Sequence, residues 1–261
     1  MRKIALLFLA VLIPMLGMAQ VEEWFEQGNA AYNEGSYEQA LERYVNIENS
    51  GMESADLYYN MGNTYYKMKQ FPMAILYYEK ALKLAPGNED IQTNLEIANL
   101  AVADKVNAIP QSFFARLWTR LKTVLSADGW AWVSVVVFGL LLLCVFVFVM
   151  ARRVGWRMVG FFAGLFLLVC LALSVIFALD RYRDLKNQDE AIVMTPTINA
   201  KSSPSVNSVD LFVLHEGAKV RIMDSAMDRP AYDSIQPQVW NLIKLADGSI
   251  GWLPAESMTP F

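Results

Sequence analysis

Histidine is almost missing from this 261-residue chain, in which His215 is the only one, and cysteine occurs twice. A single histidine with no cysteine or second histidine nearby does not provide a zinc site. Cys144 and Cys170 lie in long apolar runs, which favour an unreactive thiol over a disulfide or metal ligand. Gly-rich phosphate loops, an HExxH motif and a Ser/His/Asp set are also lacking. The sequence therefore predicts a protein that is not an enzyme and uses no cofactor or metal.

Charged residues are scarce, at 18%, whereas 55% of the residues are hydrophobic. This composition is too apolar for an ordinary soluble protein and predicts a membrane component. The formal net charge of −4 speaks against a nucleic-acid-binding protein, which needs a basic face to neutralise phosphates. The acidic excess belongs to residues 21–105, where 14 Asp and Glu stand against 6 Lys and Arg, a net charge of −8.

The first 19 residues have the three-part layout of a secretory signal peptide. Two basic residues, Arg2 and Lys3, precede an uncharged stretch that ends in Gly17-Met18-Ala19. Cleavage after Ala19 is expected. The alternative is an uncleaved anchor, but the 16 residues from Ile4 to Ala19 are short against the ~20 that a spanning helix needs.

Two longer apolar runs predict transmembrane helices at residues 129–151 and 158–179. They contain 23 and 22 residues without a charge, enough at ~1.5 Å per residue to cross a ~30 Å hydrocarbon core. Trp130, Trp132 and Trp156 lie at their ends, as interfacial aromatics do. The loop between the runs is too short for a domain, so an antiparallel hairpin is expected.

The orientation of this hairpin follows from the signal peptide. Three basic residues in the loop are balanced by three before the hairpin and three after it, so the positive-inside rule does not decide. An exported amino terminus places the loop in the cytoplasm. The expectation is a two-pass protein of the bacterial inner membrane with both soluble domains in the periplasm.

Residues 111–126, just before the hairpin, are predicted to form an amphipathic helix lying on the bilayer surface. Its apolar side chains fall on one helical face, with Arg116, Arg120 and Lys122 largely off it. The alternative is a continuation of the preceding helical stack. The apolar face comprises Phe114, Leu117, Trp118, Leu121, Val124 and Leu125.

An internal repeat relates residues 21–54 to residues 55–88. Trp24, Gly28, Asn29, Tyr32, Tyr37, Ala40 and Tyr44 recur 34 positions later as Tyr58, Gly62, Asn63, Tyr66, Phe71, Ala74 and Tyr78. A period of 34 is typical of the tetratricopeptide (TPR) repeat, whose unit is two amphipathic helices. Since about three units are usually needed to bury a continuous core, residues 89–105 are expected to add a capping helix and complete a domain at 21–105.

The chain resembles the TPR family most closely in its second repeat, from Tyr58 to Pro86. The resemblance implies that partner peptides or helices bind along a concave face formed by the first helix of each repeat. In this register the face consists of Phe25, Asn29, Tyr32, Asn33, Tyr59, Asn63, Tyr66 and Lys67. We expect the asparagine amides to bond a ligand backbone in both directions. The alternative is that the tyrosines merely pack between helices. Phe25 and Asp90 stand where carboxylate-clamp TPR domains have basic residues, so capture of a free carboxylate is not expected.

Residues 190–261 change to short β-rich runs, with a strong turn signal at Asp247-Gly248. The segments 199–204, 214–220 and 240–253 resemble the bacterial SH3 domain. This resemblance implies peptide or cell-wall binding and makes Trp240 and Trp252 candidate ligand contacts. The alternative is that both are core aromatics of a purely structural barrel.

The fold class is thus multi-domain: an all-α TPR helical repeat, a two-helix transmembrane hairpin and an all-β SH3-like barrel. In this order the parts resemble the BatE family of aerotolerance proteins. The resemblance implies an adaptor in an aerotolerance or envelope-stress complex, with von Willebrand A-domain proteins and a MoxR-type ATPase as partners. The competing hypothesis is a protein that binds or senses peptidoglycan through its SH3-like domain.

Overall fold

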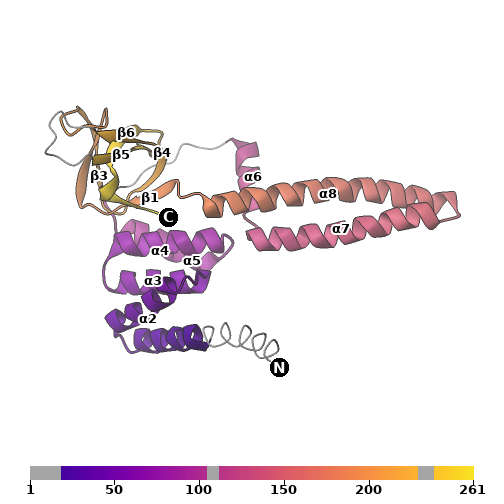
Figure 1. The fold of residues 1–261 in the computed structure, drawn as a ribbon, viewed down its shortest axis with the longest axis horizontal. Coiled ribbons are helices and arrows are strands. Elements are labelled where there is room, and N and C mark those ends of the chain that lie inside the picture. Colours follow the sequence, from indigo (N-terminus) through magenta and orange to yellow (C-terminus); the bar gives the residue numbers. More distant parts are fainter. Residues whose placement is uncertain (1–18, 105–111, 229–237) are drawn as a thin grey trace, which may run out of the picture. The chain divides into compact units, whose positions relative to one another are not determined.

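The computed structural model describes residues 19–104, 112–228 and 238–261. The expected signal peptide lies outside these residues, except for Ala19. The chain divides into two compact units (Figure 1). The first contains residues 1–82, 89–109 and 189–261, and the second contains residues 83–88 and 110–188. The multi-domain fold class is confirmed, because helical repeats, two long apolar helices and an antiparallel sheet domain are all present.

The amino-terminal part of the first unit is a series of antiparallel helices. Residues 19–33 are helical and are followed by α2 (Tyr37–Asn49), α3 (Ala55–Lys67), α4 (Phe71–Leu84) and α5 (Glu89–Leu100). Local sequence sets their ends: the Ser54 hydroxyl accepts a hydrogen bond of 3.1 Å from the Leu57 amide and caps α3. The expected capping helix corresponds to α5, which ends at Leu100.

Each repeat is held together by a glycine packed against a tyrosine ring. A Cβ placed on Gly62 would lie 2.6 Å from two ring atoms of Tyr78, and one on Gly28 would lie 2.6 Å from the ring of Tyr44. Both tyrosines are almost fully buried, at 1% exposure. The glycines are therefore required by close helix crossing, and the aromatic rings fill the space that this leaves.

The carboxy-terminal part of the first unit, which we call the β-domain, is one antiparallel sheet with the strand order β3-β2-β6-β5-β4-β1-β7. Its elements are β1 (Glu190–Val193), β2 (Thr197–Lys201), β3 (Asp210–His215), β4 (Lys219–Asp228), β5 (Gln238–Lys244), β6 (Ile250–Pro254), η1 (Ala255–Ser257) and β7 (Met258–Pro260). Its core includes Val193, Leu214, Val220, Ile243 and Leu253.

The β-domain docks on the helical repeats through the turn between β3 and β4. A Cβ on Gly217 would overlap the side chain of Val102, and Gly217 has a φ of +88°. On one side of this turn, Asp104 accepts a hydrogen bond of 2.6 Å from the His215 amide. Sequence analysis assigned the closing of the two-repeat array to a helix alone, whereas the structure adds this turn of the β-domain.

An ion cluster continues the same interface. The Lys219 ammonium lies 2.9 Å from a Glu79 carboxylate oxygen in α4 and 3.0 Å from one of Glu190 in β1. Burial alone would lower the pKa of Lys219, but the two carboxylates outweigh it and raise that pKa. Lys219 therefore stays charged and ties the sheet to the second repeat.

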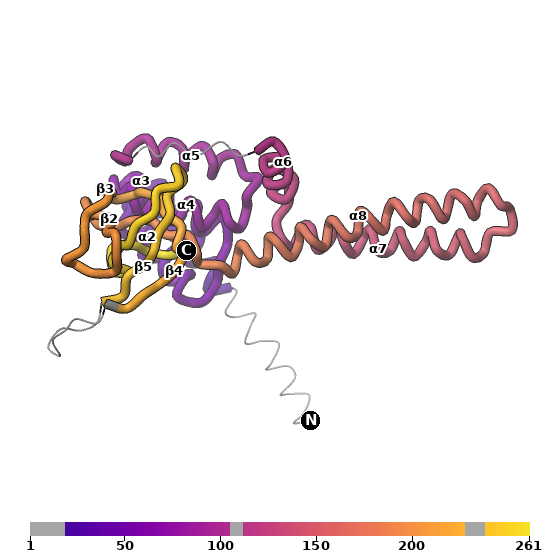
Figure 2. The backbone as a smooth tube through the Cα atoms, turned by 90° about the horizontal axis from the view of Figure 1, so that it is seen from above, coloured from indigo at the N-terminus to yellow at the C-terminus, as the bar shows by residue number. Residues whose placement is uncertain are grey.

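The second unit contains α6 (Phe113–Lys122), α7 (Ala127–Met150) and α8 (Val154–Lys186). Figures 1 and 2 both show α7 and α8 side by side along their length, and both helices are long and apolar enough to cross a membrane. They approach closely at Gly160, where a Cβ would lie 2.9 Å from the Cys144 carbonyl oxygen. The apolar run was expected at 158–179. Helix α8 extends past its end into a charged segment, from Asp180 to Lys186.

Candidate functional site

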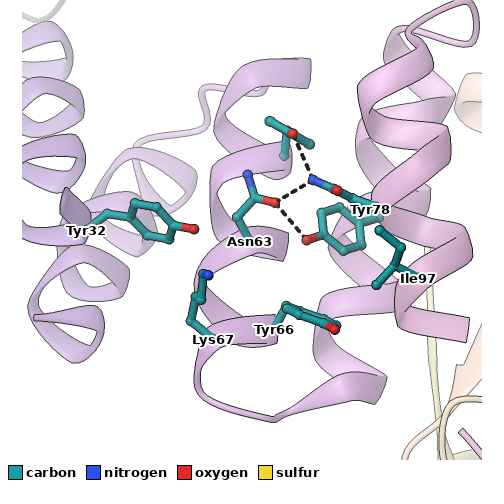
Figure 3. A pocket seen from close by; sticks show the side chains of 8 residues that line it. Tyr32, Asn63, Tyr66, Lys67, Tyr78 and Ile97 are labelled. Carbon is teal, nitrogen blue, oxygen red and sulfur yellow. Dashed lines mark hydrogen bonds between the residues drawn. The ribbon is translucent and has the colours of Figure 1, made fainter. Parts of the chain in front are cut away.

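Two adjoining hollows lie along the first helices of the repeats. The first is lined by Asn29, Tyr32, Asn33, Tyr44 and Asn60. The second, drawn in Figure 3, is lined by Tyr32, Tyr59, Asn63, Tyr66, Lys67, Tyr78, Asn94 and Ile97. Tyr32 borders both, so together they form one surface, which we call the repeat groove.

The repeat groove is built on a ladder of side-chain hydrogen bonds. The Tyr44 hydroxyl donates to Asn29 Oδ1 over 2.7 Å, and Asn60 Nδ2 donates to the same oxygen over 2.9 Å. One repeat later, the Tyr78 hydroxyl and Asn94 Nδ2 donate to Asn63 Oδ1 over 2.7 and 3.0 Å (Figure 3). Each partner recurs after 34 residues, which places α5 in the register of the first helix of a further repeat.

These hydrogen bonds determine whether the asparagine amides can act as donors or as acceptors toward a ligand. Both Oδ1 atoms already accept two hydrogen bonds, so the expectation that Asn29 and Asn63 bond a ligand in both directions is wrong for their oxygens. Neither Nδ2 atom donates to another group within the described residues. The amides are thus oriented as donors, suited to the carbonyl oxygens of an extended peptide.

The tyrosine hydroxyls of the ladder remain protonated. Burial, with a smaller contribution from Tyr32, raises the pKa of Tyr44 to about 12. Burial also raises the pKa of Tyr78, and neighbouring tyrosines including Tyr59 add to this effect. Both hydroxyls therefore act as donors at neutral pH, which holds each asparagine oxygen in place.

The structure brings together seven of the eight residues assigned to the concave face. Phe25 lines neither hollow, although its ring packs on that of Tyr44 with 6.1 Å between centroids, as the Tyr59 ring packs on Tyr78 one repeat later. Five residues that the sequence pattern did not assign to the concave face also line the groove: Tyr44, Asn60, Tyr78, Asn94 and Ile97. The spacing of 34 between Asn60 and Asn94 was a signal that could have found that pair.

The two tryptophans of the β-domain do not share a site. Trp240 is 2% exposed and lines a shallow hollow with residues of β2, including Ile198 and Lys201. Its Nε1 is buried and has no hydrogen-bond partner among the residues that the structure describes. Trp252 lies in β6 opposite Leu242, is partly buried and does not line that hollow. Trp240 is one of the largest fully buried side chains, and Ile243 of the same strand belongs to the core cluster.

The groove and its helical register define an interaction module of the TPR class. The family model of the tetratricopeptide repeat matches residues 55–88, so the chain contains a TPR repeat there. TPR repeats typically mediate protein interaction, and a protein-binding role follows for this part of the chain. A search of the curated proteins finds no match to the chain. Within the described residues, no three His, Cys, Asp or Glu side chains cluster to hold a metal.

Proposed function

We propose that this protein is a membrane-anchored adaptor whose repeat groove binds an extended segment of a partner protein. The observation that carries the proposal is the orientation of Asn29 and Asn63, whose oxygens are occupied and whose Nδ2 atoms are left to donate. Tyr32, Tyr59 and Tyr66 add aromatic surface at low entropic cost. Lys67 is the one cation among the residues that line the two hollows.

Anchorage and compartment belong to the same proposal. The hairpin of α7 and α8 would cross the bacterial inner membrane, and the signal peptide would place the repeats and the β-domain in the periplasm. The resemblance to the BatE family supports a place in an aerotolerance or envelope-stress complex, with von Willebrand A-domain proteins and a MoxR-type ATPase as partners. The β-domain would be SH3-like, and no catalytic role is proposed for any part.

The adaptor role can be tested by converting both groove asparagines to aspartate. Asn29→Asp/Asn63→Asp keeps the oxygens that accept from Tyr44 and Tyr78 but removes the two donors. A photo-crosslinking amino acid at position 66 in the full-length protein, in native membranes, is expected to give discrete partner adducts. In the double variant these adducts should fall by about tenfold or more, since two hydrogen bonds of ~1 kcal/mol each are lost.

The matched control is Asn99→Asp, which makes the same chemical change on an exposed residue of α5 that lines neither hollow. Its adducts should be unchanged. Adducts of equal yield in all three proteins would show that the groove donors do not bind the partner.

A second candidate function is peptidoglycan binding by the β-domain. It is favoured by Trp240, which lines a surface hollow and whose Nε1 has no partner within residues 19–104, 112–228 and 238–261. In this case full-length protein in detergent should sediment with purified sacculi, and Trp240→Phe should weaken binding by about fivefold through loss of one donor. Trp252→Phe, outside the hollow, is the control. Absence of sedimentation, or equal loss in both variants, would exclude this candidate.

A further inference from the structure

Helix α6 carries an apolar face that stays largely exposed among the described residues of the second unit. Phe113 and Phe114 are 65% and 79% exposed, and Leu117 and Leu121 are each more than 40% exposed. At 100° per residue these four side chains fall on one face, while Ala115 and Thr119 fall on the opposite face. The helix is therefore strongly amphipathic, with its apolar side outward.

An ion cluster fixes α6 to the end of α8. The Lys122 ammonium lies 3.0 Å from carboxylate oxygens of both Asp180 and Asp184. Burial acts to lower the pKa of Lys122, but the hydrogen bonds that its ammonium donates to Asp184 and Asp180 outweigh burial and raise that pKa. Lys122 is thus protonated, and its positive charge is balanced by the two aspartates of α8.

Aromatic contacts beside this cluster set the direction in which the apolar face points. The rings of Trp118 and Trp130 each lie 4.9 Å from the ring of Phe177, which is buried. Trp130 Nε1 also donates to the Lys122 carbonyl oxygen over 3.1 Å. Phe177 belongs to the last apolar turns of α8 and Asp180 follows it, so α6 is held where the apolar surface of the hairpin ends.

The course of α6 suits this boundary. Figure 1 shows its axis running across α8, beside the end of the hairpin where α7 begins. Figure 2 shows the same position from above. A helix that crosses a membrane-spanning hairpin at this level lies in the plane of the membrane surface.

Two cations remain on α6 after Lys122 is neutralised. Arg116 and Arg120 lie on the flank of the helix away from Trp118 and Lys122, next to Phe113 on the helical projection. Neither forms an ion pair within the described part of the chain. Guanidinium groups so placed beside an apolar face fit the phosphates of anionic phospholipids.

We propose that α6 binds the bilayer surface, with Phe113, Phe114, Leu117 and Leu121 among the acyl chains and Arg116 and Arg120 on anionic phospholipid headgroups. The occupant is a lipid surface because the apolar face of α6 continues the apolar surface of the hairpin at its end. This inference rests on the proposed membrane anchorage. It adds a lipid-binding site that sets the depth of the hairpin and makes the anchor sensitive to lipid charge.

The test uses spin labels on the full-length protein in proteoliposomes, after Cys144→Ala and Cys170→Ala remove the native thiols. Single labels are placed by Leu117→Cys on the apolar face, Thr119→Cys on the opposite face and Phe146→Cys in α7. Relaxation by oxygen, which concentrates in lipid, is compared with relaxation by a water-soluble nickel chelate. Positions 117 and 146 should respond mainly to oxygen, and position 119 mainly to nickel.

The outcomes separate the two proposals. Nickel access at 117 equal to that at 119, with 146 still in lipid, would overturn the role of α6 and leave the anchorage intact. Protection of position 117 from both reagents would show that a protein partner covers α6. This result would also overturn the proposed lipid-binding role. Nickel access at position 146 would contradict both the proposed membrane anchorage and the lipid-binding role of α6.

Lipid charge tests the arginines separately. Adding phosphatidylglycerol to phosphatidylcholine vesicles should raise the ratio of bound to unbound α6 at position 117 by about fivefold for each arginine. Arg116→Gln/Arg120→Gln should abolish this response while leaving position 146 in lipid. An equal response in the variant would overturn the assignment of headgroup binding to the two arginines.

Discussion

Tyr78→Ala is expected to lower the free energy of unfolding of the repeats by about 3–5 kcal/mol and to abolish partner binding in the groove. Tyr78 is 1% exposed, its ring fills the space above Gly62, and its hydroxyl donates to Asn63 over 2.7 Å. The substitution therefore leaves a large cavity and removes one of the two hydrogen bonds that orient the Asn63 amide in the groove. Hydrogen exchange of α3 and α4 in the full-length protein would measure the loss.

The control for this prediction is Tyr78→Phe, which keeps the ring and removes only the hydroxyl. Asn63 would still accept from Asn94, so a cost of about 1 kcal/mol is expected, with partner binding weakened less than in Tyr78→Ala. If the two variants exchanged hydrogen equally fast, the ring would not be the main support of the repeat.

Gly217→Ala is expected to loosen the β-domain from the repeats. The φ of +88° at Gly217 disfavours a side chain by about 1–2 kcal/mol. The added methyl group would also overlap Val102, and overpacking of this kind costs about 1–3 kcal/mol more. Limited proteolysis and hydrogen exchange of residues 89–104 should reveal the separation as loss of protection.

Two further variants distinguish backbone strain from docking. Gly35 has a φ of +80° and nothing within 4 Å of its Cβ position, so Gly35→Ala should show the backbone penalty without loss of protection in residues 89–104. Val102→Ala combined with Gly217→Ala should restore part of that protection, because it removes the overlapping atoms. Equal effects of Gly35→Ala and Gly217→Ala would argue against the docking contact.

Local pattern was sufficient for the helices and for most of the groove. A period of 34 and the helical projection place Asn29, Tyr32, Asn63 and Tyr66 on one surface, since an ideal helix fixes which residues share a face. Phe25 lines neither hollow, although its ring packs on Tyr44 as the Tyr59 ring packs on Tyr78, so the period of 34 alone does not fix how far the groove extends.

The repeat, the apolar hairpin and the β-rich carboxy-terminal region could all be predicted from the sequence, because periodicity and hydropathy are properties of neighbouring residues. Three features could not be predicted in this way: which asparagine atoms face the groove, how Gly217 packs against Val102, and the pairing of Lys122 with Asp180 and Asp184. The physical reason is the same in each case. These contacts join residues far apart in the chain, and their geometry depends on how whole elements pack.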